Sequence, residues 1–289
     1  MSKSSSIFKT PEGQAKCLAA YDATLALWPV PYESLDVPTR FGSTHIIISG
    51  PKDAPPLVLL HGANDSATAW YPNIADLSRN YRTYALDTIG DVGKSVASHL
   101  PQSGSDYVDW LTEMLNELKI EQAHVVGLSY GGWLTMNLVL YAPDRVKRIV
   151  LLSPAAVFVP IKLQLYIRFI FSAIFPIRPL IINNYLWLSA KGHELNEEYV
   201  EQVVMSTKHC RPKMVSPNVF SDDELRQINT PTLLLIADQE VIYNPESAVY
   251  RAIRLMPNID IKIISDAGHG MSMDQPEIVN KSILNFLNK

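Results

Sequence analysis

The pentapeptide 127–131, Gly-Leu-Ser-Tyr-Gly, has the residue types and spacing to present a reactive hydroxyl. It lies between an apolar run at 123–126 and an expected helix that begins near Tyr130. Glycines two positions either side of Ser129 leave room for a strained turn between strand and helix, and the helix N-terminus favours negative charge on the oxygen. The pattern predicts that Ser129 is a nucleophile, although a pentapeptide of this form also arises by chance in loops.

Serine is a weak nucleophile by itself, so this chemistry requires a histidine base and a carboxylate that orients the histidine. In this class of motif the carboxylate and then the histidine follow the serine along the chain. His269 follows an apolar run at 259–264 and precedes a final expected helix, so we expect it to be the base. Five other histidines have no such frame and are interpreted as surface or satisfied polar residues: His45, His99, His124, His193 and His209.

The orienting carboxylate is expected directly after the apolar run 232–236. Two candidates occur there, Asp238 and Glu240. The end of the preceding strand is another position from which some enzymes recruit this acid, but Ser153 stands there and has no carboxylate. From position alone, both carboxylates remain candidates.

The run 90–95, Gly-Asp-Val-Gly-Lys-Ser, ends like a phosphate-binding loop. Such a loop requires a glycine five positions before Gly93, and Thr88 stands there. No G-x-G-x-x-G, H-E-x-x-H or paired-cysteine motif occurs in the sequence. The sequence therefore predicts neither a cofactor nor a metal ion.

The elements that must position these residues are strands that alternate with helices. Residues 12–28 have apolar positions at helical spacing, and 35–41 with 44–49 are predicted to form an antiparallel hairpin. The alternation that follows is typical of a parallel sheet covered on both faces. The expected strands are 57–60, 82–86, 123–127, 146–152, 233–236 and 259–264, and the expected helices are 70–78, 105–118, 130–141 and 276–287.

The alternation stops after Ser153 and resumes after about residue 212. The segment 155–212 is mainly helical in pattern and is broken by prolines, which predicts a helical cap inserted into one core, 1–154 and 213–289. Aromatic residues in the cap would either form an apolar wall over a substrate or pack the cap onto the core, and the sequence favours neither. They include Phe158, Tyr166, Phe169, Phe171, Phe175, Tyr185 and Trp187.

The composition of the 289 residues excludes several classes of protein. A formal net charge of −4 and a pI near 6.0 provide no basic surface for nucleic acid. The most apolar stretch, 155–188, is interrupted by charged residues and prolines, so we expect no membrane span. Residues 1–10 lack the apolar centre of a secretory signal, and the two cysteines, Cys17 and Cys210, suit reduced thiols. We therefore expect a cytoplasmic protein.

Five segments together resemble the α/β-hydrolase superfamily in order and spacing. They are H-G-A at 61–63, D-T-I-G-D-V-G-K-S at 87–95, G-L-S-Y-G-G at 127–132, P-T-L-L-L-I-A-D-Q-E at 231–240 and D-A-G-H-G at 266–270. The resemblance covers nearly the whole chain. It implies the α/β-hydrolase fold, with a mostly parallel central sheet, helices on both faces and an inserted helical cap. Serine at position 129 separates the chain from haloalkane dehalogenases and epoxide hydrolases, which resemble this fold but use aspartate there.

Within this superfamily the chain is similar to bacterial carboxylesterases of the naproxen-esterase type. The similarity rests on L-W-P at 27–29, on T-R-F-G-S-T-H-I-I-I-S-G-P-K-D-A-P at 39–55 and on the glutamate at the acid position. It implies hydrolysis of a small-molecule carboxylic ester through an acyl-enzyme intermediate. The same residues would also serve a lactonase, a thioesterase or a perhydrolase, or a ligand-sensing receptor with little turnover.

The resemblance also implies roles for single residues. Many relatives carry Gly-x-x-Asp followed by a proline a few residues later. Residues 237–240 and Pro245 fit that frame with Glu240 as the acid and leave Asp238 as the alternative. Ala63 and Tyr130 then supply the two backbone N–H groups of the oxyanion hole. His61 is expected to shape the turn before Ala63 rather than to react.

Overall fold

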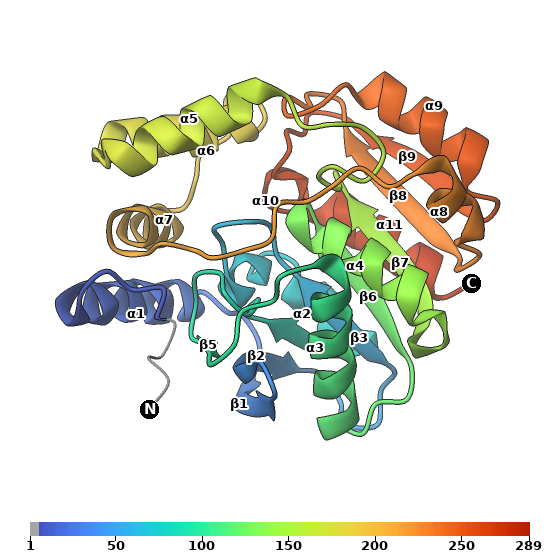
Figure 1. Ribbon diagram of the computed structural model, residues 1–289, viewed down its shortest axis with the longest axis horizontal. Coiled ribbons are helices and arrows are strands. Elements are labelled where there is room, and N and C mark those ends of the chain that lie inside the picture. The colour runs from blue at the N-terminus through green and yellow to red at the C-terminus, as the bar shows by residue number, and fades with distance from the viewer. Residues whose placement is uncertain (1–5) are drawn as a thin grey trace.

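A central sheet organises the molecule (Figure 1), and the computed structural model describes residues 6–289. The strand order is β1-β2-β4-β3-β6-β7-β8-β9, with the short β5 paired to β2. Pairs from β4 through β9 are parallel, whereas β1, β2 and β4 pair antiparallel at one edge. The strands are β1 Tyr32–Thr39, β2 Gly42–Ser49, β3 Pro56–Leu60, β4 Arg82–Leu86, β5 Val96–Ala97, β6 Ala123–Leu128, β7 Val146–Leu152, β8 Thr232–Ala237 and β9 Ile259–Ile264.

Two hydrophobic cores cover the two faces of the sheet because successive side chains of a strand point to opposite sides. In β3, Val58 and Leu60 belong to one core, and Leu57 and Leu59 belong to the other. The first core is completed by α3 Gly104–Glu117, α4 Tyr130–Tyr141, α8 Asp222–Gln227 and α9 Pro245–Leu255. The second is completed by α1 Pro11–Leu25, α2 Ile74–Asn80 and α11 Pro276–Leu287. The predicted fold class is therefore confirmed.

Three helices lie between β7 and β8, namely α5 Leu163–Ile174, α6 Arg178–Leu188 and α7 Glu197–His209. We call them the inserted helices. Figure 1 shows them at the side of the molecule beyond one end of the sheet, with α7 next to α1. The Thr24 hydroxyl of α1 donates to the Glu198 carbonyl of α7 at 3.1 Å. The N-terminal helix thus supports the insertion from below.

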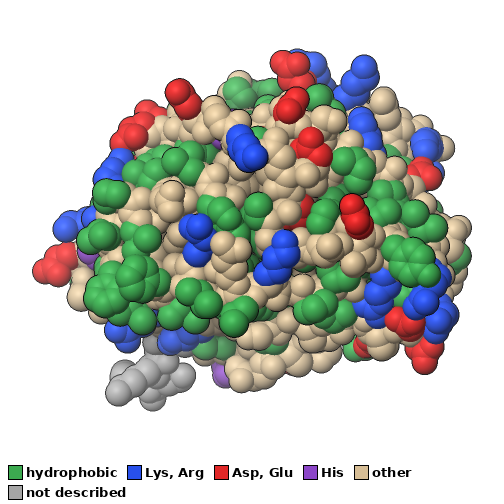
Figure 2. Space-filling model, turned by 90° about the horizontal axis from the view of Figure 1, so that it is seen from above, with side chains coloured by type: hydrophobic (Ala, Val, Ile, Leu, Met, Phe, Trp, Pro, Cys, Tyr) green, Lys and Arg blue, Asp and Glu red, His purple; other side chains and the backbone are tan. Residues whose placement is uncertain are grey.

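The outer face of α5 is apolar and exposed. In Figure 2 hydrophobic side chains gather on the side where Figure 1 places α5. The inner face of the same helix carries Leu165, Tyr166 and Phe169, which line the cavity described below. Helix α5 is therefore apolar on both faces. Its large exposed side chains are Leu163, Ile167, Ile170, Phe171 and Ile174, together with Tyr166, which lines the cavity and is exposed as well.

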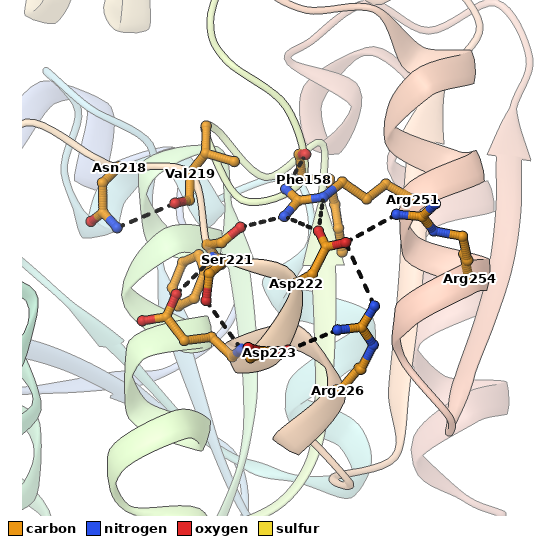
Figure 3. Close-up of polar contacts among 11 residues, drawn as sticks. Phe158, Asn218, Val219, Ser221, Asp222, Asp223, Arg226, Arg251 and Arg254 are labelled. Atoms are coloured by element: carbon orange, nitrogen blue, oxygen red, sulfur yellow. Dashed lines mark hydrogen bonds and ion pairs between the residues drawn. The ribbon is translucent and has the colours of Figure 1, made fainter.

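Arg251 of α9 joins the two chain segments through which the insertion leaves and re-enters the core. Its guanidinium donates to the carbonyls of Phe158 and Phe220, both at 2.6 Å, and pairs with Asp222 at 2.8 Å (Figure 3). Asp222 also pairs with Arg254 at 3.0 Å. These arginines, Arg251 first, lower the pKa of the Asp222 carboxyl.

Several predicted elements have other bounds in the structure. The helix expected at 70–78 is a 3₁₀ turn, Ala67–Trp70, followed by α2, because Pro72 cannot donate a hydrogen bond inside a helix. The helix expected at 12–28 ends at Leu25, ahead of Pro29. The elements β5, α8, α9 and the short α10, Met271–Asp274, were not predicted from the sequence.

Cys17 of α1 and Cys210, which follows α7, lie 193 positions apart in the chain and touch in the fold. Both are buried and free, and their sulfur atoms are 3.6 Å apart. The sequence did not predict this contact.

In the described part of the chain, no helix has both the length and the apolar character that a bilayer crossing requires. The interpretation of residues 1–10 lies partly outside the described residues, which begin at Ser6.

Candidate active site

Ser129 stands in a sharp turn between β6 and α4. Its φ of 51° is in the left-handed region, which a serine adopts only at a cost in free energy. The turn is tight because a Cβ added to Gly127 would lie 2.3 Å from the Gly131 carbonyl oxygen. Glycine at these two positions therefore permits a turn that places the Ser129 hydroxyl at the N-terminus of α4.

Ser129 opens into a cavity of about 290 Å³ between the carboxyl ends of the strands and the inserted helices. His269 lines the same cavity, as do Ala63 and Tyr130. The rest of the wall is mainly apolar, which suits a ligand with apolar groups. Its apolar members include Leu128, Leu165, Phe169, Leu188, Met214 and Val215.

His269 and Glu240 form a buried pair. His269 Nδ1 lies 2.8 Å from Glu240 Oε2, and the Glu240 side chain is fully buried. The second carboxylate oxygen, Oε1, accepts the backbone N–H of Ile242 at 2.9 Å. Burial opposes ionisation of Glu240, but His269 and the Ile242 N–H outweigh burial and lower its pKa. Glu240 is thus an ionised acceptor at neutral pH, with the geometry that fixes the imidazole ring.

Asp238, the alternative acid, has different partners. Its two carboxylate oxygens accept the backbone N–H groups of Asp266 and Ala267 at 3.0 and 3.1 Å. These bonds hold the loop that carries His269, while the ring of His269 bonds to Glu240. The structure therefore brings Glu240, and not Asp238, to the histidine ring.

His61 supports the turn that carries Ala63. Its Nε2 accepts the backbone N–H of Thr88 at 3.0 Å, so the ring proton is on Nδ1. Nδ1 lies 2.7 Å from the Gly62 carbonyl, to which it donates. With both ring nitrogens occupied, His61 is a structural residue, as expected.

Two buried carboxylates lie behind the same turn. Asp91 accepts the backbone N–H of Asn64 at 3.0 Å, and Asp65 accepts the Tyr199 hydroxyl of α7 at 2.7 Å. Burial raises the pKa of both carboxyls, that of Asp91 well above its usual range. Asp65 lines the cavity and ties it to an inserted helix.

The run at 90–95 that ends like a phosphate-binding loop has a structural role. The Lys94 backbone N–H donates to Asp87 at 2.7 Å, and the Lys94 side chain pairs with Asp22 of α1. In the described residues, no group of three or more His, Cys, Asp or Glu side chains is arranged to hold a metal ion.

Comparison with known families decides the assignment of the chain. The model of the Alpha/beta hydrolase family matches residues 57–282, which include every residue of the site described above. The chain belongs to the alpha/beta hydrolase family.

Within this family, several relatives are similar over nearly their full length. The uncharacterized carboxylesterase nap of Bacillus subtilis is 42% identical over 99% of this chain and 96% of its own. Carboxylesterase YbfK of the same organism is 39% identical over 97% of this chain and 96% of its own. The crystal structure of naproxen esterase from Bacillus subtilis has a TM-score of 0.91, with 41% identity over 97% of this chain and 100% of that one. The predicted resemblance to this type of hydrolase is confirmed.

Two parts of the site in this family member were not predicted from the sequence. Residues 214–217 line the cavity, although the predicted cap ends at 212. They are held by the Tyr130 hydroxyl, which donates to the Val215 carbonyl at 2.9 Å. Asp274, five positions after His269, is a buried carboxylate. It lies beside the loop 265–270 that carries His269, which we call the histidine loop. No sequence motif marked Asp274, because its hydrogen-bond partners are backbone N–H groups.

Proposed function

We propose that the chain is a serine carboxylesterase. Ser129 is the nucleophile, His269 the base and Glu240 the acid that orients His269. One observation carries the proposal: His269, whose ring is bonded to the buried Glu240, lines the same cavity as a serine in a strained turn at a helix N-terminus. The names of the relatives nap, YbfK and naproxen esterase support a carboxylic ester as the bond that is cleaved.

The reaction proceeds in two halves. His269 Nε2 takes the proton of the Ser129 hydroxyl as Oγ bonds to the ester carbonyl carbon, and the carbonyl oxygen becomes an oxyanion. The backbone N–H groups of Ala63 and Tyr130 stabilise this oxyanion, each by on the order of 3 kcal/mol. The C–O bond to the alcohol then breaks, and His269 returns the proton to the leaving oxygen. Water, deprotonated by His269, releases the acid by the same steps.

We infer that residues 155–212 act as a cap over this site. The support is the position of α5 and α6, whose residues Leu165, Phe169 and Leu188 form apolar walls of the cavity. Such walls suit an apolar acyl or alcohol group on a small ester. Among the aromatic residues of the insertion, Tyr166, Phe169 and Tyr185 line the cavity, whereas Phe171 and Phe175 are exposed and fulfil neither of the two roles left open. The cytoplasmic location stays a prediction from the cysteine content.

Hydrolysis of p-nitrophenyl butyrate by the wild type and three variants tests the proposal. Ser129→Ala removes the attacking oxygen and is expected to lower kcat by about 10⁴- to 10⁶-fold. Glu240→Gln leaves His269 without an anionic partner and is expected to cost about 10³- to 10⁴-fold. Asp238→Asn keeps one acceptor for the histidine loop and is expected to retain most of the activity.

The controls are circular dichroism of each variant and a screen of acid release from ester, lactone and thioester substrates. Full activity of Ser129→Ala would rule out the serine mechanism. Wild-type protein that is folded but releases no acid from any substrate would favour a ligand-sensing role.

A further inference from the structure

The end of α6 is bonded to the loops that carry the proposed base and acid. The Gly270 backbone N–H donates to the Leu188 carbonyl at 3.1 Å. The Lys191 backbone N–H donates to the Gln239 side-chain oxygen at 3.0 Å, next to Glu240. The segment 188–191 is therefore bonded to the residue after His269 and to the residue before Glu240.

Asp274 joins this segment to the histidine loop through a single oxygen atom. Its Oδ2 accepts the backbone N–H of Gly268 and that of Ala190, both at 2.8 Å. The side chain is only 1% exposed, and its other oxygen, Oδ1, accepts no hydrogen bond. Nε2 of His193 lies 3.6 Å from Oδ1. Asp274 therefore bridges two backbone N–H groups, that of Gly268 beside His269 and that of Ala190 after α6.

The two bridged segments are also packed without space between them. A Cβ added to Gly268 would lie 2.4 Å from the Leu188 carbonyl oxygen and 2.7 Å from the Ala190 nitrogen. Because both neighbours are backbone atoms, neither can give way by rotating a side chain. A side chain at position 268 would therefore force the histidine loop and the end of α6 apart.

The histidine loop is held from the core side as well, by the bonds from Asp266 and Ala267 to Asp238. Asp238 reaches only the residues before Gly268. Gly268 itself, which directly precedes His269, has its N–H on Asp274. The last backbone anchor before the imidazole is thus supplied by the bridge to the insertion.

We propose that Asp274 is a positioning residue that couples the seating of the cap to the placement of His269. His269 is held in line with Ser129 only while segment 188–191 is bonded to the histidine loop through Asp274. This inference rests on the proposed function, because it takes His269 as the base.

The test compares Asp274→Ala, Asp274→Asn and Gly268→Ala with the wild type. Alanine at 274 removes the bridge. Asparagine retains one carbonyl oxygen that can accept both N–H groups, and its NH₂ replaces an oxygen that accepts no hydrogen bond. Alanine at 268 separates the same two segments while Asp274 stays in place. Asp222→Ala is the control, because Asp222 joins α8 to α9 through arginines and does not line the cavity.

All measurements are made well below the melting temperature of each variant. The first gives kcat and KM for p-nitrophenyl butyrate, and the second gives the rate at which a fluorophosphonate labels Ser129. The third is hydrogen exchange of peptides from 185–192 and 265–272. For Asp274→Ala and Gly268→Ala we expect kcat and labelling to fall about 10- to 100-fold, with KM changed by less than about threefold. Both peptides should exchange faster together. Asp274→Asn should restore kcat to within about threefold of the wild type, and Asp222→Ala should leave all three readouts unchanged.

Wild-type kcat in folded Asp274→Ala would overturn the proposal, as would faster exchange in only one of the two peptides. Loss of activity in Asp274→Asn equal to that in Asp274→Ala would also overturn it, since charge rather than the bridge would then be responsible. If the wild type itself neither turns over the ester nor reacts with the fluorophosphonate, the proposed function fails. The exchange data still decide whether Asp274 couples the two segments.

Discussion

Glu240 and Asp238 are two positions apart, and each accepts hydrogen bonds from a different part of the loop that carries His269. Glu240 bonds to the ring at 2.8 Å, whereas Asp238 accepts N–H groups of Asp266 and Ala267. The reach of the side chain decides which carboxylate meets the ring. The backbone before Glu240 is held by other contacts, since the N–H groups of Asp238 and Gln239 donate to the carbonyls of Ile264 and Ala267, both at 3.0 Å. The length of the side chain at 240 therefore sets how far its carboxylate reaches toward Nδ1.

This geometry predicts the effect of shortening the acid. Glu240→Asp keeps the charge but removes one methylene, so the carboxylate stops short of Nδ1. We expect kcat/KM to fall about 10- to 100-fold, less than for Glu240→Gln, because a displacement of about 1 Å at a catalytic group costs up to 10²-fold. Steady-state kinetics on p-nitrophenyl butyrate measure both. A Glu240→Asp variant as inactive as Glu240→Gln would show that side-chain length matters as much as charge, contrary to this expectation.

At this scale the sequence identified the residues with chemical signatures and missed those without. Ser129 and His269 stand in recognisable frames, so both were predicted for the site. Asp274 has no motif of its own, because its role depends on the backbone N–H groups of Gly268 and Ala190. Ala190 lies 84 positions before Asp274 in the chain. Contacts of that kind are made by the fold and leave no local pattern.

The turn between β6 and α4 is the element on which the site depends most. A Cβ on Gly131 would lie 2.2 Å from the Leu60 carbonyl oxygen and 2.7 Å from that of His61. Both are backbone atoms at the end of β3, beside the turn that carries Ala63. The spacing between the two proposed oxyanion donors, Ala63 and Tyr130, is thus set by the absence of a side chain at 131.

Gly131→Ala is therefore expected to damage stability and activity together. Forcing one methyl group into a filled space costs about 1–3 kcal/mol, and α4 must move away from β3 to accept it. Urea unfolding followed by circular dichroism measures the stability, and p-nitrophenyl butyrate hydrolysis measures the activity of the folded fraction. Wild-type stability with wild-type kcat would contradict the close packing described for this turn.

Most elements of the sheet were predictable, and the reasons for the misses are physical. The buried parallel strands are continuous apolar runs, which made β3, β6 and β7 visible in the sequence. Helix α9 was missed although it carries the signals of a helix: the N-cap Asn244, Pro245 at its first position, and buried residues at helical spacing, Ala248, Ala252 and Leu255. Strand β5 has two residues and is defined only by its pairing with β2.

The stability of the whole molecule should depend on pH through His124 of β6. The ring is buried against Tyr81, and its Nδ1 has no hydrogen-bond partner in the structure. Burial, with nearby Lys147 and Arg148, lowers the pKa of His124 from 6.5 to about 4. The unfolded chain therefore binds a proton on this residue before the folded one does. Stability is complete above pH 6.5 and is lost as the pH falls toward 4.

His124→Gln removes this titration. We expect the free energy of unfolding of the wild type to fall by about 1–2 kcal/mol more than that of His124→Gln between pH 6.5 and 4.5, after allowance for partial solvent screening of the ring. Urea titrations at several pH values measure the difference. Parallel pH dependence in the two proteins would show that His124 does not contribute to acid destabilisation.

The arrangement of the whole molecule was predictable in class but not in its long-range contacts. Strands alternating with helices predicted a parallel sheet with two covered faces, and the structure has both. The pairing of α1 with α7, and with it the contact between Cys17 and Cys210, joins segments 193 positions apart. No periodicity within either segment specifies such a partner.

The central claim is that ester hydrolysis passes through an acyl group on Ser129. The most direct measurement is peptide mass spectrometry of the protein after a rapid acid quench during turnover of p-nitrophenyl butyrate, with Ser129→Ala in parallel. The account predicts one butyryl group on the peptide that contains Ser129 in the wild type and none in the variant. A butyryl group on another residue, or steady release of p-nitrophenol by Ser129→Ala at the wild-type rate, would contradict it.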